Sequence, residues 1–371
     1  MKVSLEELTQ KSGDLSAADV AAHLDITDQA QIDEVQQLAE RVLLDECGNK
    51  VYFRGLVEAS NICKSDCHYC GIRKFNKVPE RYQLEAETVV ELAKRAKALN
   101  YASFVIQAGE RQDEGFIEYI EGIVRSIKEQ TRCEVLPEGL GITLSVGQHT
   151  KETYQRFYDA GAHRYLLRIE TTNPDLFAKL HPEAQTLQSR MACLGYLRDI
   201  GYQVGTGVMI GLPQQTTLDL ANDILFFRDF DIDMIGMGPF IPDPAAYDVG
   251  GMEWAADECP SAEERVLQTL LMTAMTRIIL RDVNIAATTA LQALEPHARE
   301  RALRFGANVM MPLLTPQDVR KNYNLYPKKS LRDEASDDFH RELEERIHAQ
   351  GRVVGYGVWG DSPHALKEAR L

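Results

Sequence analysis

The feature of this sequence that most limits its fold is an alternation, repeated eight times, of a short apolar run with a longer amphipathic segment. Short runs bounded by turn residues predict strands, and apolar residues three and four positions apart predict helices. Strands that alternate with helices pair in parallel, because each crossover helix returns the chain to the same edge. The predicted strands are 51–58, 103–108, 141–146, 164–169, 204–210, 234–238, 284–289 and 308–312. Eight such units predict an α/β protein with a closed (β/α)8, TIM-type barrel.

Helical patterns fill the intervals between these strands and also precede them. The predicted crossover helices are 86–99, 116–129, 151–160, 187–200, 217–230, 262–280 and 295–305. Two further helical patterns, 17–24 and 31–44, lie before the first strand, and one at 339–348 lies near the end. We therefore expect an N-terminal helical cap (1–50), a barrel (51–315) and a C-terminal extension packed outside the barrel (316–371).

Charge and apolar content narrow the possible partners. The 371 residues carry a formal net charge of −15, whereas nucleic-acid binding needs a basic face to match the phosphates. No apolar run approaches the roughly 20 residues of a membrane span, and the first ten residues lack the apolar core of a secretory signal. We expect a cytoplasmic protein that binds neither nucleic acid nor membrane.

Three of the seven cysteines, Cys63, Cys67 and Cys70, lie within eight residues, directly after the first predicted strand. Their C-x3-C-x2-C spacing places three thiolates on one loop, where they face a single metal centre. Three thiolates leave one iron of a 4Fe-4S cluster open to a small-molecule ligand. A structural zinc site is the alternative, but zinc normally takes four ligands in two spaced pairs, and no second C-x2-C exists. His68 could complete a zinc site only in an awkward geometry.

The cysteine loop resembles that of the radical S-adenosylmethionine (SAM) family, including the aromatic Tyr69 before the last cysteine. The resemblance implies one 4Fe-4S cluster whose open iron binds the amino and carboxylate groups of SAM. An electron from the cluster then cleaves SAM to methionine and a 5'-deoxyadenosyl radical. The implied SAM contacts are Tyr69, Gln107, Gly109, Glu110, Glu170 and Arg190.

Other polar and aromatic residues at the ends of predicted strands are candidate substrate contacts. Arg168 and Glu170 are two residues apart, so on a strand they point to the same side, and the resemblance assigns Arg168 to an anionic substrate. Thr288 and Thr289 end the seventh predicted strand, and Met234 begins the sixth, where it is either core filler or a soft contact. The remaining candidates, which would close the cavity or point into the barrel, are Tyr323, Tyr326 and Arg54.

A narrower resemblance, over residues 50–328, is to the HydE family of FeFe-hydrogenase maturases. It rests on five segments in the same order: 164–171, 211–216, 238–244, 287–289 and 306–308. It implies a role in assembling the dinuclear iron subcluster (H-cluster) of the hydrogenase. The substrate would be a small organometallic iron-cysteinate complex supplied by HydG, and the product would pass to HydF. Transient contact with a small electron-transfer protein is also implied.

The sequence departs from this family at two places. Residues 327–335 contain no cysteine, so we expect one cluster rather than two. Ile169 stands where the family commonly has histidine, which affects substrate detail but not SAM cleavage.

Three other functions remain open at this point. A methylornithine synthase uses the same barrel, although the Gly-Pro-Phe-Ile-Pro and Ala-Thr-Thr segments favour HydE. A biotin synthase is a poorer match, because it needs a second cluster. A non-enzymatic iron-sulfur scaffold would leave the inward charges without a task.

Overall fold

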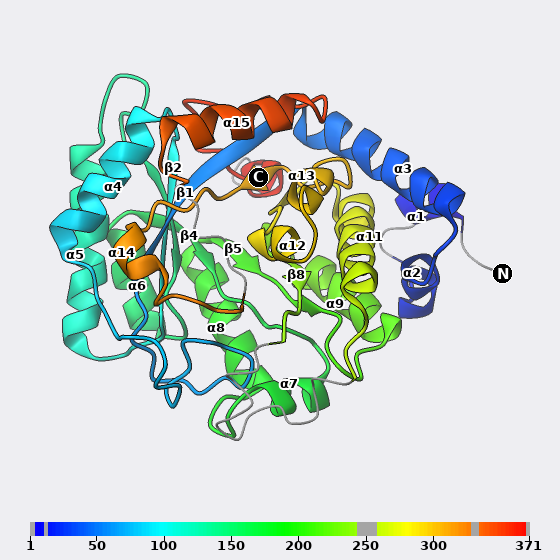
Figure 1. Ribbon diagram of the computed structural model, residues 1–371, viewed down its shortest axis with the longest axis horizontal. Coiled ribbons are helices and arrows are strands. Elements are labelled where there is room, and N and C mark those ends of the chain that lie inside the picture. Colours follow the sequence, from blue (N-terminus) through cyan, green and yellow to red (C-terminus); the bar gives the residue numbers. More distant parts are fainter. Residues whose placement is uncertain (1–3, 11–13, 243–257, 328–333, 369–371) are drawn as a thin grey trace.

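The computed structural model describes residues 4–10, 14–242, 258–327 and 334–368. Eight parallel strand positions form a barrel in the order β10-β1-β2-β3-β4-β5-β7-β9. A parallel bridge between Ala286 and Val309 brings the end of β9 beside β10 and closes the sheet. The strands are β1 (Lys50–Ser60), β2 (Ser103–Ala108), β3 (Gly141–Ser145), β4 (Ala162–Leu166), β5 (Gln203–Thr206), β7 (Met234–Ile235), β9 (Asn284–Ile285) and β10 (Val309–Met310). The predicted α/β barrel is confirmed (Figure 1).

A short second pairing continues two of these strands. β6 (Met209–Ile210) follows β5, β8 (Gly238–Pro239) follows β7, and the two pair in parallel. They extend the barrel wall toward the carboxyl ends of the strands, where TIM-type barrels carry their functional loops.

Helices surround the barrel, and most begin at a side-chain cap. Asp113, Thr150 and Thr216 each accept a hydrogen bond from a backbone N–H in the first turn of the helix that follows. The crossover helices are α4 (Ala86–Ala98), α5 (Glu114–Gln130), α6 (Lys151–Asp159), α8 (Leu187–Ile200), α9 (Thr217–Asp229) and α11 (Ala262–Leu280). Smaller helices are α7 (Pro174–Leu180), α12 (Thr289–Leu294), α13 (Ala298–Arg301) and α14 (Gln317–Arg320).

The N-terminal helices are part of the same core as the barrel. They are α1 (Leu5–Gln10), α2 (Ala17–Leu24) and α3 (Gln29–Cys47). α2 and α3 lie against α11 on the side away from the barrel (Figure 1), so α11 is buried around its whole circumference. Because cap, barrel and extension share one hydrophobic core, we keep their division at residues 50 and 315 as a proposal.

Two predicted elements differ in the structure. The predicted helix 295–305 is shorter in the structure, where α13 spans Ala298–Arg301. It cannot begin at Glu295, because a residue before proline is driven out of the helical region. Glu295, which precedes Pro296, is extended (φ −140°, ψ 126°), and His297 then adopts a left-handed conformation. The seventh predicted strand is also too long: it ends at Ile285, and Thr288 is instead the N-cap of α12.

We had expected the C-terminal extension only to pack outside the barrel. In the structure it also covers one end of the barrel. It comprises α15 (Asp337–His348), β11 (Val353–Val354), which pairs with the start of β1, and α16 (Pro363–Glu368). Between β11 and α16 the chain crosses the amino-terminal end of the barrel. There the carbonyl of Gly360 accepts hydrogen bonds from Arg54 (3.2 Å) and Asn284 (2.9 Å). Asp361 accepts one from Arg164 (3.0 Å). This end of the barrel is thereby covered, which leaves the opposite end for chemistry.

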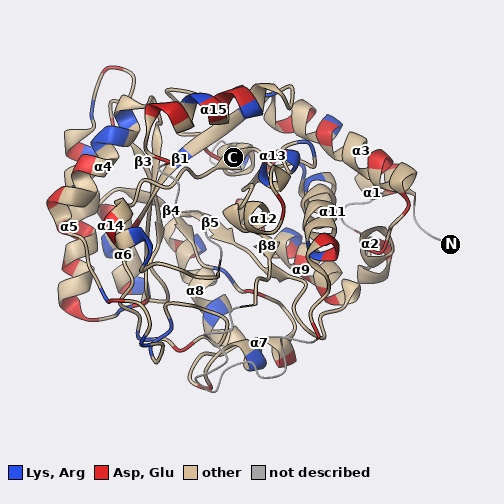
Figure 2. Ribbon diagram, viewed as in Figure 1, with Lys and Arg blue, Asp and Glu red and all other residues tan. Residues whose placement is uncertain are grey.

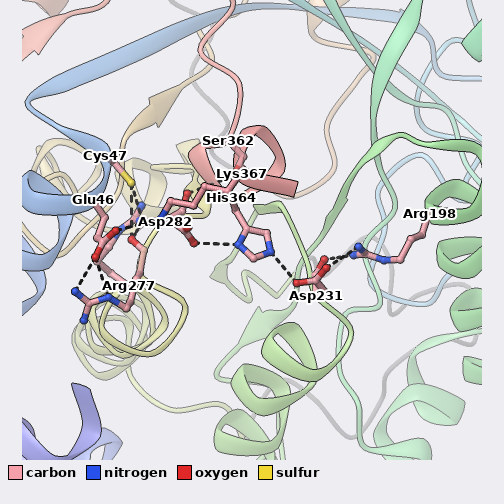
Figure 3. A network of polar contacts seen from close by, with 10 residues as sticks. Glu46, Cys47, Arg198, Asp231, Arg277, Asp282, Ser362, His364 and Lys367 are labelled. Carbon is pink, nitrogen blue, oxygen red and sulfur yellow. Dashed lines mark hydrogen bonds and ion pairs between the residues drawn. The ribbon is translucent and has the colours of Figure 1, made fainter. Parts of the chain in front are cut away.

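A polar network fastens α16 to the barrel (Figure 3). His364 lies between two carboxylates, with Nε2 2.7 Å from Asp231 and Nδ1 3.0 Å from Asp282. Lys367 donates to Asp282 (2.8 Å). The hydrogen bonds to Asp282 and Asp231 raise the pKa of His364 to about 9, so the imidazole is a cation at neutral pH.

In the part of the chain that the structure describes, every helix is too short or too polar to cross a lipid bilayer.

Stability should depend on pH through His364. Because its folded-state pKa is raised from about 6.5 to about 9, its contribution is complete below about pH 6.5 and is lost as the pH rises through 9. After allowance for solvent screening at this half-buried site, His364→Ala should lower the free energy of unfolding by about 1 kcal/mol at pH 6.5. The loss should be smaller at pH 10, as measured by urea denaturation. His348→Ala, at an exposed histidine of α15, is the control. Equal losses at the two pH values for His364→Ala would contradict the role of its charge.

Candidate active site

A cavity of about 340 Å³ opens at the carboxyl ends of the strands. Of the sixteen candidate residues predicted from the sequence, all but Met234 and Arg54 line it. They are Cys63, Cys67, Tyr69, Cys70, Gln107, Gly109, Glu110, Arg168, Glu170, Arg190, Thr288, Thr289, Tyr323 and Tyr326. The barrel therefore gathers residues from most of its strands around one space.

The three cysteines lie on the cluster loop, residues 61–82, which follows β1. Arg81 holds this loop together from inside. Its guanidinium donates to four backbone carbonyls, of Asn61, Ile72, Arg73 and Asn76, at 2.6–2.8 Å. A second clamp joins the Arg73 guanidinium to the Asp66 carboxylate at 2.6 and 2.7 Å. The loop is thus held in shape by hydrogen bonds of its own.

The chemistry of the thiols fits a metal cluster. Burial raises the pKa of Cys70 to about 12, with the Cys63 thiol adding to the effect. Burial, followed by the nearby Cys70, also holds the pKa of Cys67 well above its usual range. Three thiols that oppose each other's ionisation need a shared cation to become thiolates together. Bound iron would supply that charge.

The arrangement does not suit a single zinc ion. Sulfur ligands of one tetrahedral zinc lie about 3.8 Å apart, given Zn–S bonds of about 2.3 Å. Among the described residues, no group of three or more Cys, His, Asp or Glu is arranged to hold one metal ion. His68 turns away, with Nδ1 3.0 Å from the Lys179 carbonyl at the end of α7. A larger cluster, in which each thiolate binds a different iron, fits three separated thiols on one loop.

Gly109 allows the cluster loop to approach β2. A Cβ atom at this position would lie 2.5 Å from the Ile62 carbonyl oxygen and 2.9 Å from the Cys63 Cβ. The approach is fixed by a backbone hydrogen bond from Gly109 to Ser60 (2.8 Å). The glycine thus sets the position of the first cysteine, a role that its place after the second strand did not specify.

Glu110 is a brace between the cluster loop and β3. Its carboxylate accepts hydrogen bonds from the Ser65 hydroxyl (3.0 Å) and the Gln148 backbone (2.8 Å). Lys64 is a weaker ionic partner at 3.7 Å. Glu110 lines the cavity, but its oxygens hold protein groups. Our expectation that it binds SAM stays a proposal.

A chain of polar contacts links the cluster loop to the segment that follows β4. The Tyr69 hydroxyl donates to Glu170 Oε1 (3.2 Å), and Arg168 forms an ion pair with Glu170 Oε2 (2.9 Å). Arg190 of α8 donates to the Arg168 carbonyl (2.7 Å). These four side chains would orient a charged ligand beside the cysteines.

The geometry that joins Arg168 to Glu170 differs from our reasoning. β4 ends at Leu166, so neither residue lies on a regular strand. Glu170 has a left-handed backbone (φ +63°) and bridges to Val208. This conformation is uncommon for a residue other than glycine and marks a functional constraint. The two side chains meet because the chain turns there, not because of strand alternation.

Met234 and Arg54 lie at the other end of the barrel. Arg54 Nη1 is 3.0 Å from the Met234 sulfur, and Arg54 also bonds the Gly360 carbonyl of the C-terminal extension. Arg54 does point inward, as the sequence allowed. Met234 does not line the cavity, although Gly236 two positions on does, and we no longer propose Met234 as a substrate contact.

Hydroxyl groups also line the cavity. The Thr289 and Tyr326 hydroxyls are 2.9 Å apart. Thr288 Oγ1 is buried and has no hydrogen-bond partner. Gly238 makes room for it, since a Cβ there would lie 2.8 Å away. Tyr323 is almost fully buried, on the segment whose Leu325 carbonyl accepts a hydrogen bond from Gly71 of the cluster loop (3.1 Å).

Sequence reasoning missed six polar residues that line the cavity, which are Glu58, Ser65, Ser145, Gln185, Arg299 of α13 and Glu334. Arg299 is 1% exposed, and its Nε and Nη2 atoms have no hydrogen-bond partner. Its nearest carboxylate, on Glu334, is 3.9 Å from Nη1. Only the interruption of the predicted helix at Pro296 hinted that this segment departs from a solvated crossover. Gln185 lies between α7 and α8, where no motif marked it.

Ile169 is not a cavity residue. It is fully buried in the hydrophobic core. Its difference from the family histidine therefore leaves the lining of the cavity unchanged.

Gly109→Ala should impair metal loading. The new methyl group would clash with Ile62 and Cys63, a strain of about 1–3 kcal/mol that the chain can relieve by displacing the cluster loop. Iron and sulfide bound after anaerobic reconstitution should fall below the wild-type content. Gly122→Ala is the matched control, because a Cβ there meets no atom within 4 Å. Full iron content in Gly109→Ala would contradict the proposed packing.

The chain is similar to several characterised proteins. Residues 57–227 match the Radical SAM superfamily. FeFe hydrogenase maturase subunit HydE from Thermotoga maritima is 40% identical over 310 residues, 82% of each chain. The crystal structure of methylornithine synthase (PylB) has a TM-score of 0.77 at 20% identity, covering 99% of this chain and 100% of that one. The maturase HydG from Carboxydothermus hydrogenoformans has a TM-score of 0.76 at 18% identity, with coverage of 95% and 78%.

The two structural similarities, at such low identity, establish the fold alone. The sequence similarity to HydE is stronger evidence than the two structural similarities, because its identity is 40% and it covers most of the chain, the cysteine loop included. A radical SAM enzyme uses a 4Fe-4S cluster and SAM, and the cavity supplies three thiols and a polar wall for them. The chain belongs to the radical SAM superfamily and, within it, to the HydE family of hydrogenase maturases.

Proposed function

We propose that this enzyme acts in assembling the dinuclear iron subcluster of FeFe-hydrogenase. Its substrate is a small anionic iron-cysteinate complex, supplied by a HydG-type enzyme and passed on to a HydF-type scaffold. When bound, the cluster and SAM supply one electron and a 5'-deoxyadenosyl radical. We place the activity in the cytoplasm, because all seven cysteines are free thiols.

The observation that carries the substrate proposal is the unsatisfied guanidinium of Arg299. A buried arginine with two unpaired nitrogens is costly unless an anion completes its hydrogen bonds. Planar N–H donors suit cyanide or carboxylate groups of an anionic complex. Thr288 Oγ1, also unpartnered, offers a further donor in the same cavity.

The residues that line the cavity would have different tasks. Cys63, Cys67 and Cys70 would hold the cluster, and Tyr69 with Glu170 would position SAM beside it. Arg299, Thr288 and the hydroxyls of Thr289 and Tyr326 would hold the substrate. Apolar residues such as Leu56 and Met311 also line the cavity and would limit the access of water to a radical.

The function is tested by anaerobic reconstitution, reduction with dithionite, and addition of SAM. The enzyme should form 5'-deoxyadenosine, whereas an iron-sulfur scaffold should form none. Adding the iron-cysteinate complex should change the radical products, and adding lysine should leave them unchanged. A change with lysine alone would favour a methylornithine synthase and contradict the proposal.

Arg299→Met should weaken the use of the iron complex. Loss of one or two charged hydrogen bonds, each worth about 1.5–3 kcal/mol, predicts a drop of about tenfold or more in kcat/KM for that substrate. The yield of 5'-deoxyadenosine in the absence of substrate should stay near that of the wild type. Arg301→Met, on the same short helix but exposed and paired with Glu295, is the control. If both variants behave alike with the complex, Arg299 is not a substrate contact.

A further inference from the structure

The cluster loop exposes apolar side chains. Ile62, Phe75 and Val78 are 36%, 53% and 81% exposed. They are three of the ten large apolar residues that are exposed in the described part of the chain, and they fall within seventeen consecutive positions. Scattered apolar residues on a surface need no explanation, whereas a group of them marks an interaction site.

Basic side chains surround this apolar group. Lys64, Lys74 and Lys77 are exposed on the same loop. Residues 62–82 contain five basic and two acidic side chains, a net charge of +3 in a chain of net charge −15. One of the two acidic residues, Asp66, is already bound by Arg73. Acidic side chains are instead frequent on outer helices such as α5 and α15 (Figure 2).

A hollow beside these residues leads toward the cysteines. It is bounded by Lys74 and Phe75 on the cluster loop and by Tyr196 on α8. Gln185 and Ser65 line both this hollow and the cavity of the active site. The side-chain amide oxygen of Gln185 accepts a hydrogen bond from the Cys67 thiol (3.4 Å). Gln185 therefore lines the outer hollow and also contacts a cluster ligand.

We propose that this face, made of Ile62, Lys64, Lys74, Phe75, Lys77 and Val78, docks a small acidic one-electron carrier protein. The proposal rests on the function proposed above, because it needs the cluster. One electron leaves the reduced carrier and enters the oxidised cluster, once for each SAM cleaved, and no bond changes at the face itself. The lysines attract the acidic carrier, and Phe75 with Val78 forms the apolar centre of the contact.

Charge and the need for an electron together favour this occupant over others. A second copy of the chain is also strongly acidic and would match the lysines, but it would not supply the electron that the cluster needs. A nucleic acid would need a larger basic surface than three lysines and would gain nothing from exposed Phe75 and Val78. An acidic carrier matches the lysines and has a reason to approach Cys67.

The double variant Lys74→Glu/Lys77→Glu separates docking from catalysis. We would measure 5'-deoxyadenosine formation with two reductants, photoreduced flavodoxin as an acidic carrier and dithionite as a small molecule. With flavodoxin at low salt, the rate should fall about tenfold or more, because attraction becomes repulsion. With dithionite, the rate should equal that of the wild type. The wild-type rate with flavodoxin should itself decline as salt is added.

Lys94→Glu/Lys97→Glu, on α4, is the control, with the same spacing and the same change of charge. It should leave both rates unchanged. Phe75→Ala should slow the flavodoxin reaction alone, which tests the apolar centre without altering charge. Equal flavodoxin rates in the two double variants would overturn the docking proposal. Absence of 5'-deoxyadenosine from the wild type with dithionite would instead refute the proposed function.

Discussion

The active site depends on the close approach of the cluster loop to the end of β2. Gly109 has no side chain, so the backbone of Ile62 and the first cysteine can lie directly against it. Arg81 then ties the start of the loop to the part that follows the last cysteine, by bonding one carbonyl before the cysteines and three after them. The carboxylate of Glu110, the next residue after Gly109, accepts a hydrogen bond from the Ser65 hydroxyl of this loop. Three thiols are thereby brought to one cavity by covalent spacing and packing.

The rest of the barrel supports this arrangement from both ends. The C-terminal extension covers the amino-terminal end, where buried arginines such as Arg54 and Arg164 bond Gly360 and Asp361. The carboxyl end keeps a cavity that is lined by the three thiols and by an unsatisfied guanidinium. A reactive radical requires such a space, open to substrate but closed elsewhere. The two ends thus divide stability from chemistry, as is usual in barrels of this type.

The sequence predicted those features that depend on short-range pattern. Alternating apolar runs predicted the strands, and the cysteine spacing predicted the side of the barrel that carries the site. It could not predict the left-handed Glu170, because tertiary contacts override the local preference of that residue. It also missed Arg299, which looks like an ordinary helical arginine until the barrel closes around it. The path of residues 359–362 across the barrel likewise depends on contacts with strands that lie from 76 to 306 residues away in the sequence.

Met234 shows what a residue's position along a predicted strand cannot decide. The sequence placed Met234 at the start of a strand, but it did not show whether the side chain faces the cavity or the C-terminal extension that covers the other end of the barrel. Arg54 meets the Met234 sulfur at the covered end. Side chains near the carboxyl ends, such as Thr288, remain available to the cavity instead.

The most direct test of the whole interpretation is Mössbauer and EPR spectroscopy of the protein reconstituted with 57Fe, recorded with and without SAM. We expect one cluster of about four irons per chain, with one iron site whose spectrum changes when SAM is added. A mononuclear iron signal, or a cluster whose spectrum is indifferent to SAM, would contradict the account of three thiolates and one open iron.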